Sequence, residues 1–181
     1  MSQAHLSVRN LQESDIDLIA EYWLQADAAF MKGLGVDLAK LPSREEWQRM
    51  LQEQISQPLE QKQSYCLIWE ANGAPVGHSN INKIIAGEQA FMHLHLWHGG
   101  NRQKGLGAAL VRLTLPHFFE AYRLQKLYCE PYALNPAPNK TLERAGFEFL
   151  RTYTTTPGWI NFEQPVNRWL MTRERLLEIA V

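Results

Sequence analysis

The stretch WHGGNRQKGLGAALVRLTLPHFFEAY, residues 97–122, joins the end of an apolar strand to an amphipathic helix through a turn rich in glycine and positive charge. The first backbone N–H groups of a helix have no intrahelical partner, and the helix dipole adds positive potential at that end. Gly105 and Gly107 allow left-handed turn geometry and let an anion approach the amides, while Arg102 and Lys104 add charge. This stretch therefore predicts a phosphate-binding turn.

Two familiar phosphate-binding patterns fit this turn poorly. A P-loop requires lysine and then serine or threonine after its second glycine, but Leu106 and Gly107 follow Gly105, so a P-loop is excluded. A dinucleotide fingerprint requires a third glycine where this chain has Leu110. It stays a weak alternative, in which Glu130 would stand about where an acid binds the ribose.

A third pattern, Arg/Gln-x-x-Gly-x-Gly/Ala, matches RQKGLGA at residues 102–108 and resembles the acetyl-CoA loop of the GNAT superfamily of N-acyltransferases. A second segment, NPAPNKTLERAGF at residues 135–147, is similar to the Asn-x-x-Ser-Asn-x-x-Leu-Glu-Lys-x-Gly-Phe segment of that family. The likeness is strongest to the branch that acetylates protein N-termini and aminoglycosides. The two segments lie at the family's usual separation and together cover residues from about 90 to 150.

The resemblance implies acetyl-CoA as co-substrate, with its pyrophosphate held by the amides of the loop and of the first helical turn. The residues concerned are Arg102, Gln103, Lys104, Gly105, Leu106, Gly107 and Ala108. It also implies that the backbone of Leu96 and Trp97 pairs with the pantetheine amides. Asn135 and Asn139 would hydrogen-bond the cofactor arm or the substrate, with simple helix capping as the alternative.

Composition indicates one globular domain, residues 1–181, with 45% hydrophobic and 20% charged residues. The net charge of −1 argues against a nucleic-acid partner, and no apolar run is long enough to cross a membrane. Cys66 and Cys129 are isolated, and no signal peptide is evident, so we expect a cytoplasmic protein. The sequence carries no coiled-coil signal, and a homodimer is left open.

Hydrophobic periodicity and turn residues predict a mixed order of strands and helices. Strands are expected near 6–8, 64–71, 76–85, 89–97, 126–132, 147–155 and 167–172, and helices near 16–23, 44–55, from 106 onward, and 138–145. Residues 27–41 have no clear assignment, and Pro116 is expected to kink or end its helix. This order predicts an α/β (α+β) domain with a largely antiparallel sheet. The resemblance implies the GNAT fold, with a mixed sheet of about six or seven strands, about four helices, and splayed fourth and fifth strands.

His93 and His95 are the candidate general bases. Strand alternation places them with Phe91 and Trp97 on one face of the strand before the loop. An imidazole can accept a proton near neutral pH, and a His-x-His pair on this strand resembles that of the arylalkylamine N-acetyltransferases. The alternative is two structural histidines. No third ligand stands at a recognisable spacing, so we expect no metal.

The general acid is not evident. The family's usual tyrosine position holds Leu142, and a serine position of the N-terminal acetyltransferase branch holds Pro138. A proton for the departing thiolate would then come from water, Tyr132 or Tyr153.

Acceptor contacts are expected from Phe30 and from Trp159 and Glu163 in the long segment between the last two strands. The acidic residues are scattered, so the sequence does not choose between a small-molecule amine and a peptide N-terminus. The expected function is direct acetyl transfer from acetyl-CoA to a primary amine in a ternary complex. The alternative is a non-catalytic acyl-CoA-binding module.

Overall fold

The structure, a computed structural model, describes residues 4–97 and 105–179. Its centre is a seven-stranded sheet in the order β1-β2-β3-β4-β5-β7-β6. The β4–β5 pair is parallel, and the other neighbouring pairs are antiparallel. The strands are β1 Leu6–Asn10, β2 Tyr65–Ala71, β3 Ala74–Ile85, β4 Gln89–Leu96, β5 Lys126–Cys129, β6 Glu148–Thr155 and β7 Gln164–Thr172.

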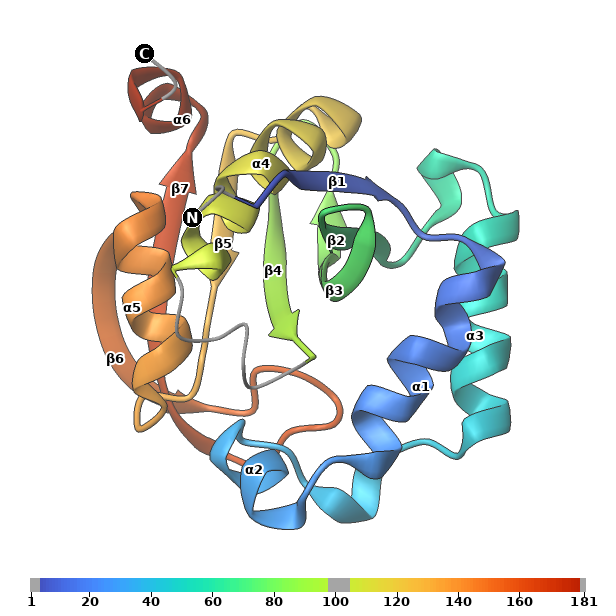
Figure 1. The fold of residues 1–181 in the computed structure, drawn as a ribbon. Helices are drawn as coiled ribbons and strands as arrows, with labels where there is room; N and C mark the ends of the chain where they lie inside the picture. Colours follow the sequence, from blue (N-terminus) through green and yellow to red (C-terminus); the bar gives the residue numbers. More distant parts are fainter. Residues whose placement is uncertain (1–3, 98–104, 180–181) are drawn as a thin grey trace.

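The parallel pair separates part-way along its length. Pairing between β4 and β5 ends at Met92 with Cys129, although β4 continues to Leu96. Figure 1 shows the two strands parting toward the lower end of β4. The expected splay of the fourth and fifth strands is confirmed.

Within residues 4–97 and 105–179, six α-helices and three short 3₁₀ helices accompany the sheet. The α-helices are α1 Ile16–Gln25, α2 Ala28–Gly33, α3 Arg44–Ser56, α4 Leu106–Tyr122, α5 Pro136–Ala145 and α6 Arg173–Ile179. The 3₁₀ helices are Glu13–Asp15, Leu38–Lys40 and Leu59–Gln61. The expected number of about four is too low, because α2 and α6 were not predicted. Both are short, at six and seven residues, and α2 owes its start to Asp27, which caps the amides of Ala29 and Phe30.

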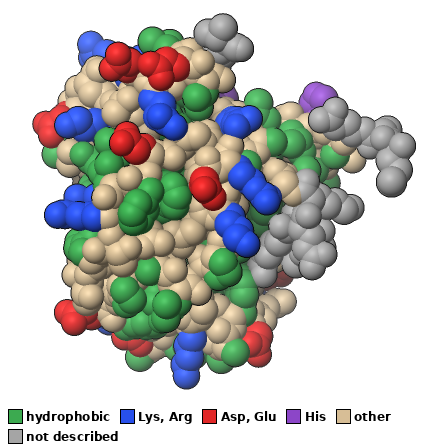
Figure 2. Space-filling model, turned by 90° about the vertical axis from the view of Figure 1, so that its left-hand side faces the viewer, with side chains coloured by type: hydrophobic (Ala, Val, Ile, Leu, Met, Phe, Trp, Pro, Cys, Tyr) green, Lys and Arg blue, Asp and Glu red, His purple; other side chains and the backbone are tan. Residues whose placement is uncertain are grey.

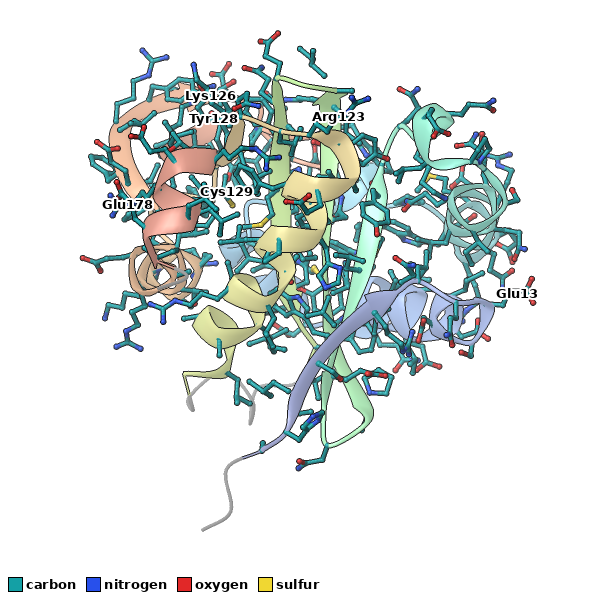
Figure 3. The ribbon with its side chains drawn as sticks, turned by 90° about the horizontal axis from the view of Figure 1, so that it is seen from above. Glu13, Arg123, Lys126, Tyr128, Cys129 and Glu178 are labelled. Carbon is teal, nitrogen blue, oxygen red and sulfur yellow. The ribbon has the colours of Figure 1, made fainter. Side chains whose placement is uncertain are left out.

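A separate hydrophobic cluster packs on each face of the sheet. Leu67, Met92, Leu110 and Phe118 belong to the cluster under α4 and α5. The other cluster lies under α1 and α3 and contains, in order along the chain, Ile19, Trp23, Trp47, Cys66 and Ile68. Figure 3 views the sheet from above, with Arg123 at the C-terminal end of α4 and Cys129 on β5. Side chains of successive strand residues therefore enter different cores, as the alternation predicts.

Helix α4 continues through Pro116, so of the two expected outcomes the early end of its regular part is wrong, and the kink stays a prediction. Proline removes the hydrogen bond that its amide would give to the carbonyl of residue 112. Arg112 and Pro116 both lie on the exposed side of the helix, where water can bind that carbonyl. The buried side packs through Leu115, Phe118 and Phe119.

Some element boundaries differ from expectation. Strand β5 ends at Cys129 instead of residue 132, since the chain turns away from β4 before Pro131. Helix α5 starts at Pro136, two residues early, because Asn135 caps it. On the face that carries β6 and α5, acidic and basic side chains alternate with apolar ones (Figure 2). Within the described part of the chain, no helix combines the length and the apolar character that crossing a membrane requires.

Candidate functional site

The N-terminus of α4 offers uncapped amides to an anion. Gly105 stands at the N-cap in left-handed conformation, at φ 69°, and its missing side chain leaves the amides without a side-chain cap. The first turn, which includes Leu106, Gly107 and Ala108, contains no acidic residue to repel a phosphate. The described half of the predicted cofactor loop therefore fits a pyrophosphate. Arg102, Gln103 and Lys104 lie outside the described residues.

Gly107 is also a point of close approach between three elements. A Cβ atom at this position would lie 3.3 Å from the Thr141 side chain on α5 and 3.6 Å from Leu96 Cδ1 on β4. The first turn of α4 thus lies directly against the end of β4. The anion site and the gap between β4 and β5 are therefore adjacent.

The backbone of β4 beyond Met92 faces this gap at alternate residues. The amide of Trp97 donates to Val76 O on β3 at 3.0 Å, so it points away from β5. Backbone groups of neighbouring strand residues point to opposite sides, which directs those of Leu94 and Leu96 toward the gap. Of the two residues expected to pair with pantetheine, Leu96 keeps that geometry. The amide of Trp97 does not, because β3 already uses it.

A cavity of about 480 Å³ runs through the gap between the strands. Its walls include Met92 and Leu94 from the α4 side of the sheet and His93 and His95 from the α1 side. The lining includes four successive residues of β4 and Cys129 of β5, so the cavity reaches the gap where the two strands part. Such a volume suits a drug-sized ligand. A thioester arriving along the gap would thus reach the histidine face.

His93 lines the cavity as a partly buried, neutral imidazole. Its Nε2 donates to Asn82 Oδ1 at 3.2 Å, which leaves Nδ1 as the proton acceptor. Burial and the positive charge of Lys83 together lower the pKa of His93 to about 4, against the opposing effect of Glu130. At neutral pH the ring is therefore ready to accept a proton, although it is a weak base.

His95 belongs to a packed aromatic group. Its Nδ1 lies 3.1 Å from Tyr22 Oη, its ring meets Trp23 edge-on, and it stacks on His78 with centroids 4.8 Å apart. His78 Nδ1 accepts from Trp97 Nε1 at 2.8 Å, so the proton of that neutral ring is on Nε2. These contacts fix the position of His95. Sequence reasoning did not identify His78 because it lies on another strand, opposite His95.

Acidification will destabilise the fold through His78. Burial lowers its pKa to about 3, and His93 lowers it further, so the unfolded chain, with a histidine pKa near 6.5, binds more protons between these values. Stability present at pH 7 is lost as the pH falls through 6.5, by about 2 kcal/mol at pH 5. The variant His78→Asn keeps an acceptor for Trp97. Between pH 7 and pH 5, its free energy of unfolding, measured with urea, should fall by about 2 kcal/mol less than that of the wild type.

The exposed substitution His117→Asn is the matched control, and its loss between pH 7 and pH 5 should equal that of the wild type. If His78→Asn also loses as much stability as the wild type, His78 is not the group that resists protonation in the fold.

Glu130 forms a buried ion pair beside the cavity. Its side chain is 5% exposed, lies 2.6 Å from Arg168 Nε, and accepts a hydrogen bond from the Tyr153 hydroxyl. Arg168 also donates to Tyr153 Oη at 2.7 Å. Burial, together with the hydrogen bond and negative charge of Glu130, raises the pKa of Tyr153. The three residues come from separate elements, so sequence spacing did not reveal the group.

The two asparagines predicted near the cofactor differ in role. Asn135 caps α5 through Ala137 N at 3.3 Å and also lines the cavity. Asn139 donates to Tyr132 O and Asn135 O. Its Oδ1 accepts from Asn167 Nδ2 and from Trp169 Nε1, each at 2.9 Å. Its amide is therefore fully used, and we assign Asn139 a structural role.

Of the three predicted acceptor residues, the structure brings one to the cavity. Trp159 lines it and is 57% exposed. Phe30 packs on Tyr22 within the cluster under α1, and Glu163 is exposed; neither contributes to the lining. Alternation explains Glu163, since its neighbour Gln164 takes the buried position.

The structure also separates the four positions considered for the general acid, which are the two family positions and the two candidate tyrosines. Pro138 and Tyr132 line the cavity, whereas Leu142 is fully buried in the core. The Tyr153 hydroxyl is already bound to Glu130 and Arg168, outside the lining. Over residues 4–97 and 105–179, no three His, Cys, Asp or Glu side chains are grouped to hold a metal ion.

The family model described as acetyltransferase (GNAT) domain matches residues 5–148. The chain belongs to the GNAT family. None of the curated proteins matches the sequence of this GNAT protein. Solved structures share its fold, and the sheet order excludes the doubly wound parallel sheet of the dinucleotide alternative.

Three of these structures illustrate the likeness. Aminoglycoside acetyltransferase AAC(6')-Ib, in complex with coenzyme A and kanamycin, has a TM-score of 0.77 at 19% identity, covering 98% of this chain and 100% of its own. Spermidine N-acetyltransferase from Vibrio cholerae, in complex with CoA and spermine, has a TM-score of 0.76 at 18% identity, covering 95% of this chain and 98% of its own. The ribosomal L7/L12 α-N-protein acetyltransferase RimL, in complex with coenzyme A, has a TM-score of 0.75 at 16% identity, covering 94% of this chain and 95% of its own.

Proposed function

We propose that this GNAT protein transfers the acetyl group of acetyl-CoA directly to a primary amine in a ternary complex. The observation that carries the proposal is the cavity that reaches the gap between β4 and β5. The uncapped N-terminus of α4 lies at one side of the gap, and His93 lies on the other face. The family match and the CoA complexes of the similar folds support this assignment.

Alignment of the two substrates is the main contribution of this chain. The α4 amides would hold the pyrophosphate, and the backbone of Leu94 and Leu96 would bind the pantetheine arm in the gap. The thioester would then stand beside His93, where an amine approaching from the α1 side can attack it. Holding two reactants together in this way can lower a barrier by several kcal/mol.

His93 acts on the proton after attack instead of before it. A base of pKa about 4 cannot deprotonate a resting ammonium of pKa near 10, so the amine must bind in its neutral form. Attack on the carbonyl makes the nitrogen of the tetrahedral adduct far more acidic. Nδ1 of His93 then accepts that proton, and the departing thiolate is protonated by water or by Tyr132 at the cavity wall.

The reducing conditions of the cytoplasm suit the two cysteines, which are free and buried, and we place the activity there.

The decisive experiment measures acetyl-CoA binding by isothermal titration and then turnover by release of CoA thiol with a panel of primary amines. Micromolar binding and amine-dependent thiol release are expected. Binding without turnover by any amine would leave the non-catalytic acyl-CoA-binding module as the function. Absence of binding by any CoA species would overturn the acetyltransferase assignment.

A further inference from the structure

The acceptor side of the cavity has an aromatic wall. Trp23 stacks on Trp47 at a centroid distance of 5.5 Å and an interplanar angle of 9°, and Trp47 contacts Trp159 at 6.3 Å. All three line the cavity, and more than half of the surface of Trp159 is exposed. A partly exposed tryptophan at a cavity wall offers a flat apolar surface to a ligand.

Carboxylates are scarce on the same wall. Among the described residues that line the cavity, Glu53 and Glu130 are the only acidic ones. Arg168 neutralises Glu130, whereas Glu53 is exposed to solvent and accepts a hydrogen bond from Gln57. A ligand with several ammonium groups needs a carboxylate for each group that it buries. Among the described lining residues, only Glu53 is left to pair with such an ammonium group.

A positive charge, that of Lys83, lies close to the reacting centre. Lys83 donates to Pro157 O at 3.1 Å, lies 4.9 Å from the Phe91 ring centroid, and opposes protonation of His93. A second cation on the substrate would be repelled here, so the charge around the site disfavours a polyamine.

Two segments distant in sequence are joined at one wall of the cavity. Asp37 N donates to Ile160 O, Lys40 Nζ donates to Asn161 O, each at 2.8 Å, and Asn161 Nδ2 donates to Gly35 O at 2.9 Å. Val36 and Ile160, within these segments, line the cavity. These hydrogen bonds fix the wall that carries Ile160, next to Trp159.

Resting on the acetyl transfer proposed above, we propose that the acceptor is a small primary amine with no charged group besides the amine itself and with an aromatic or apolar body that lies against Trp159 and Trp47. The neutral nitrogen attacks the thioester carbonyl, a C–N bond forms, and the C–S bond breaks. The amine proton passes to His93 and on to solvent, and the thiolate takes up a proton. The products are an N-substituted acetamide and CoA thiol.

The test compares acceptors at saturating acetyl-CoA, with CoA thiol release as the readout. The probes are 2-phenylethylamine, spermidine, kanamycin and a tetrapeptide with a free α-amino group. The expected kcat/KM for 2-phenylethylamine is about 100-fold above that for spermidine, since each unpaired buried charge costs several kcal/mol. Equal or better use of spermidine, kanamycin or the peptide overturns the acceptor class while leaving acetyl transfer intact. No transfer to any amine, with acetyl-CoA bound, overturns both proposals.

A variant locates the acceptor on the aromatic wall. Trp159→Ala should raise the KM for 2-phenylethylamine about tenfold with an unchanged KM for acetyl-CoA, because a lost aromatic contact costs about 1 kcal/mol or more. Trp159→Phe should restore most of the affinity. Leu177→Ala, at an exposed apolar residue of α6 outside the cavity, is the matched control. Unchanged KM values in Trp159→Ala would show that the amine binds elsewhere.

Discussion

Replacing His93 with glutamine lowers kcat by about 10²- to 10⁴-fold, the usual contribution of a general base, without changing the KM for acetyl-CoA. Glutamine preserves most of the volume and can still donate to Asn82 Oδ1, so the variant removes the proton acceptor and little else. Initial rates of CoA thiol release at saturating amine give kcat. Thermal unfolding of both proteins shows whether the fold is retained.

His95→Gln is the control that separates the two histidines of the strand. His95 is held by Tyr22, Trp23 and His78, so its replacement should affect stability more than chemistry. If His95→Gln loses the larger factor in kcat, then His95 is the base and His93 is the structural residue.

The pH dependence gives the same experiment a second readout. Because burial holds the pKa of His93 near 4, the ring stays neutral from about pH 5 upward. The wild-type kcat/KM should therefore rise about tenfold per pH unit, as the amine loses its proton, up to the amine pKa near 10. His93→Gln should show the same slope at a lower rate. An inflection near pH 6.5 in the wild type, absent from the variant, would contradict the depressed pKa.

Local signals made the cofactor half of the site predictable. The helix stripe, the strand of residues 91–96 and the left-handed Gly105 act over a few residues and appear in the fold as expected, whereas Gly107 is helical and its expected left-handed geometry is wrong. Pro116 shows the limit of such rules, because a local breaker is tolerated where Phe118 and Phe119 anchor the next turn. Tertiary packing allows α4 to continue past Pro116, and a short stretch of sequence does not reveal such packing.

The acceptor half depends on long-range contacts. Glu130, Arg168 and Tyr153 meet from three elements, and the segments near Asp37 and Ile160 are joined across more than a hundred residues. None of these pairs has a periodic or motif signature. Asn139 illustrates the same limit within a motif, since its partners on β7 use its whole amide.

The second large effect is expected at Gly107, where valine should weaken acetyl-CoA binding about 100-fold in isothermal titration. Its Cβ would press on Thr141 at 3.3 Å, its methyl groups would have less room still, and the first turn of α4 would move from its place beside Leu96. Hydrogen bonds from amides to a charged phosphate are worth about 1.5–3 kcal/mol each, so losing one or two accounts for the factor. Gly33→Val is the matched control, because no atom lies within 4 Å of a Cβ there.

A double variant separates crowding at α5 from a direct effect on the phosphate. The Cβ of residue 107 points toward Thr141 and Leu96, so Gly107→Ala should weaken binding only through that contact. Gly107→Ala combined with Thr141→Ala removes the nearest atoms and should bring the Kd for acetyl-CoA back close to the wild-type value. If the double variant binds as weakly as Gly107→Ala, the Cβ acts on the ligand itself, and the pyrophosphate must lie on the α5 side of the turn. Wild-type affinity in Gly107→Val would show that the amides of α4 do not hold the cofactor.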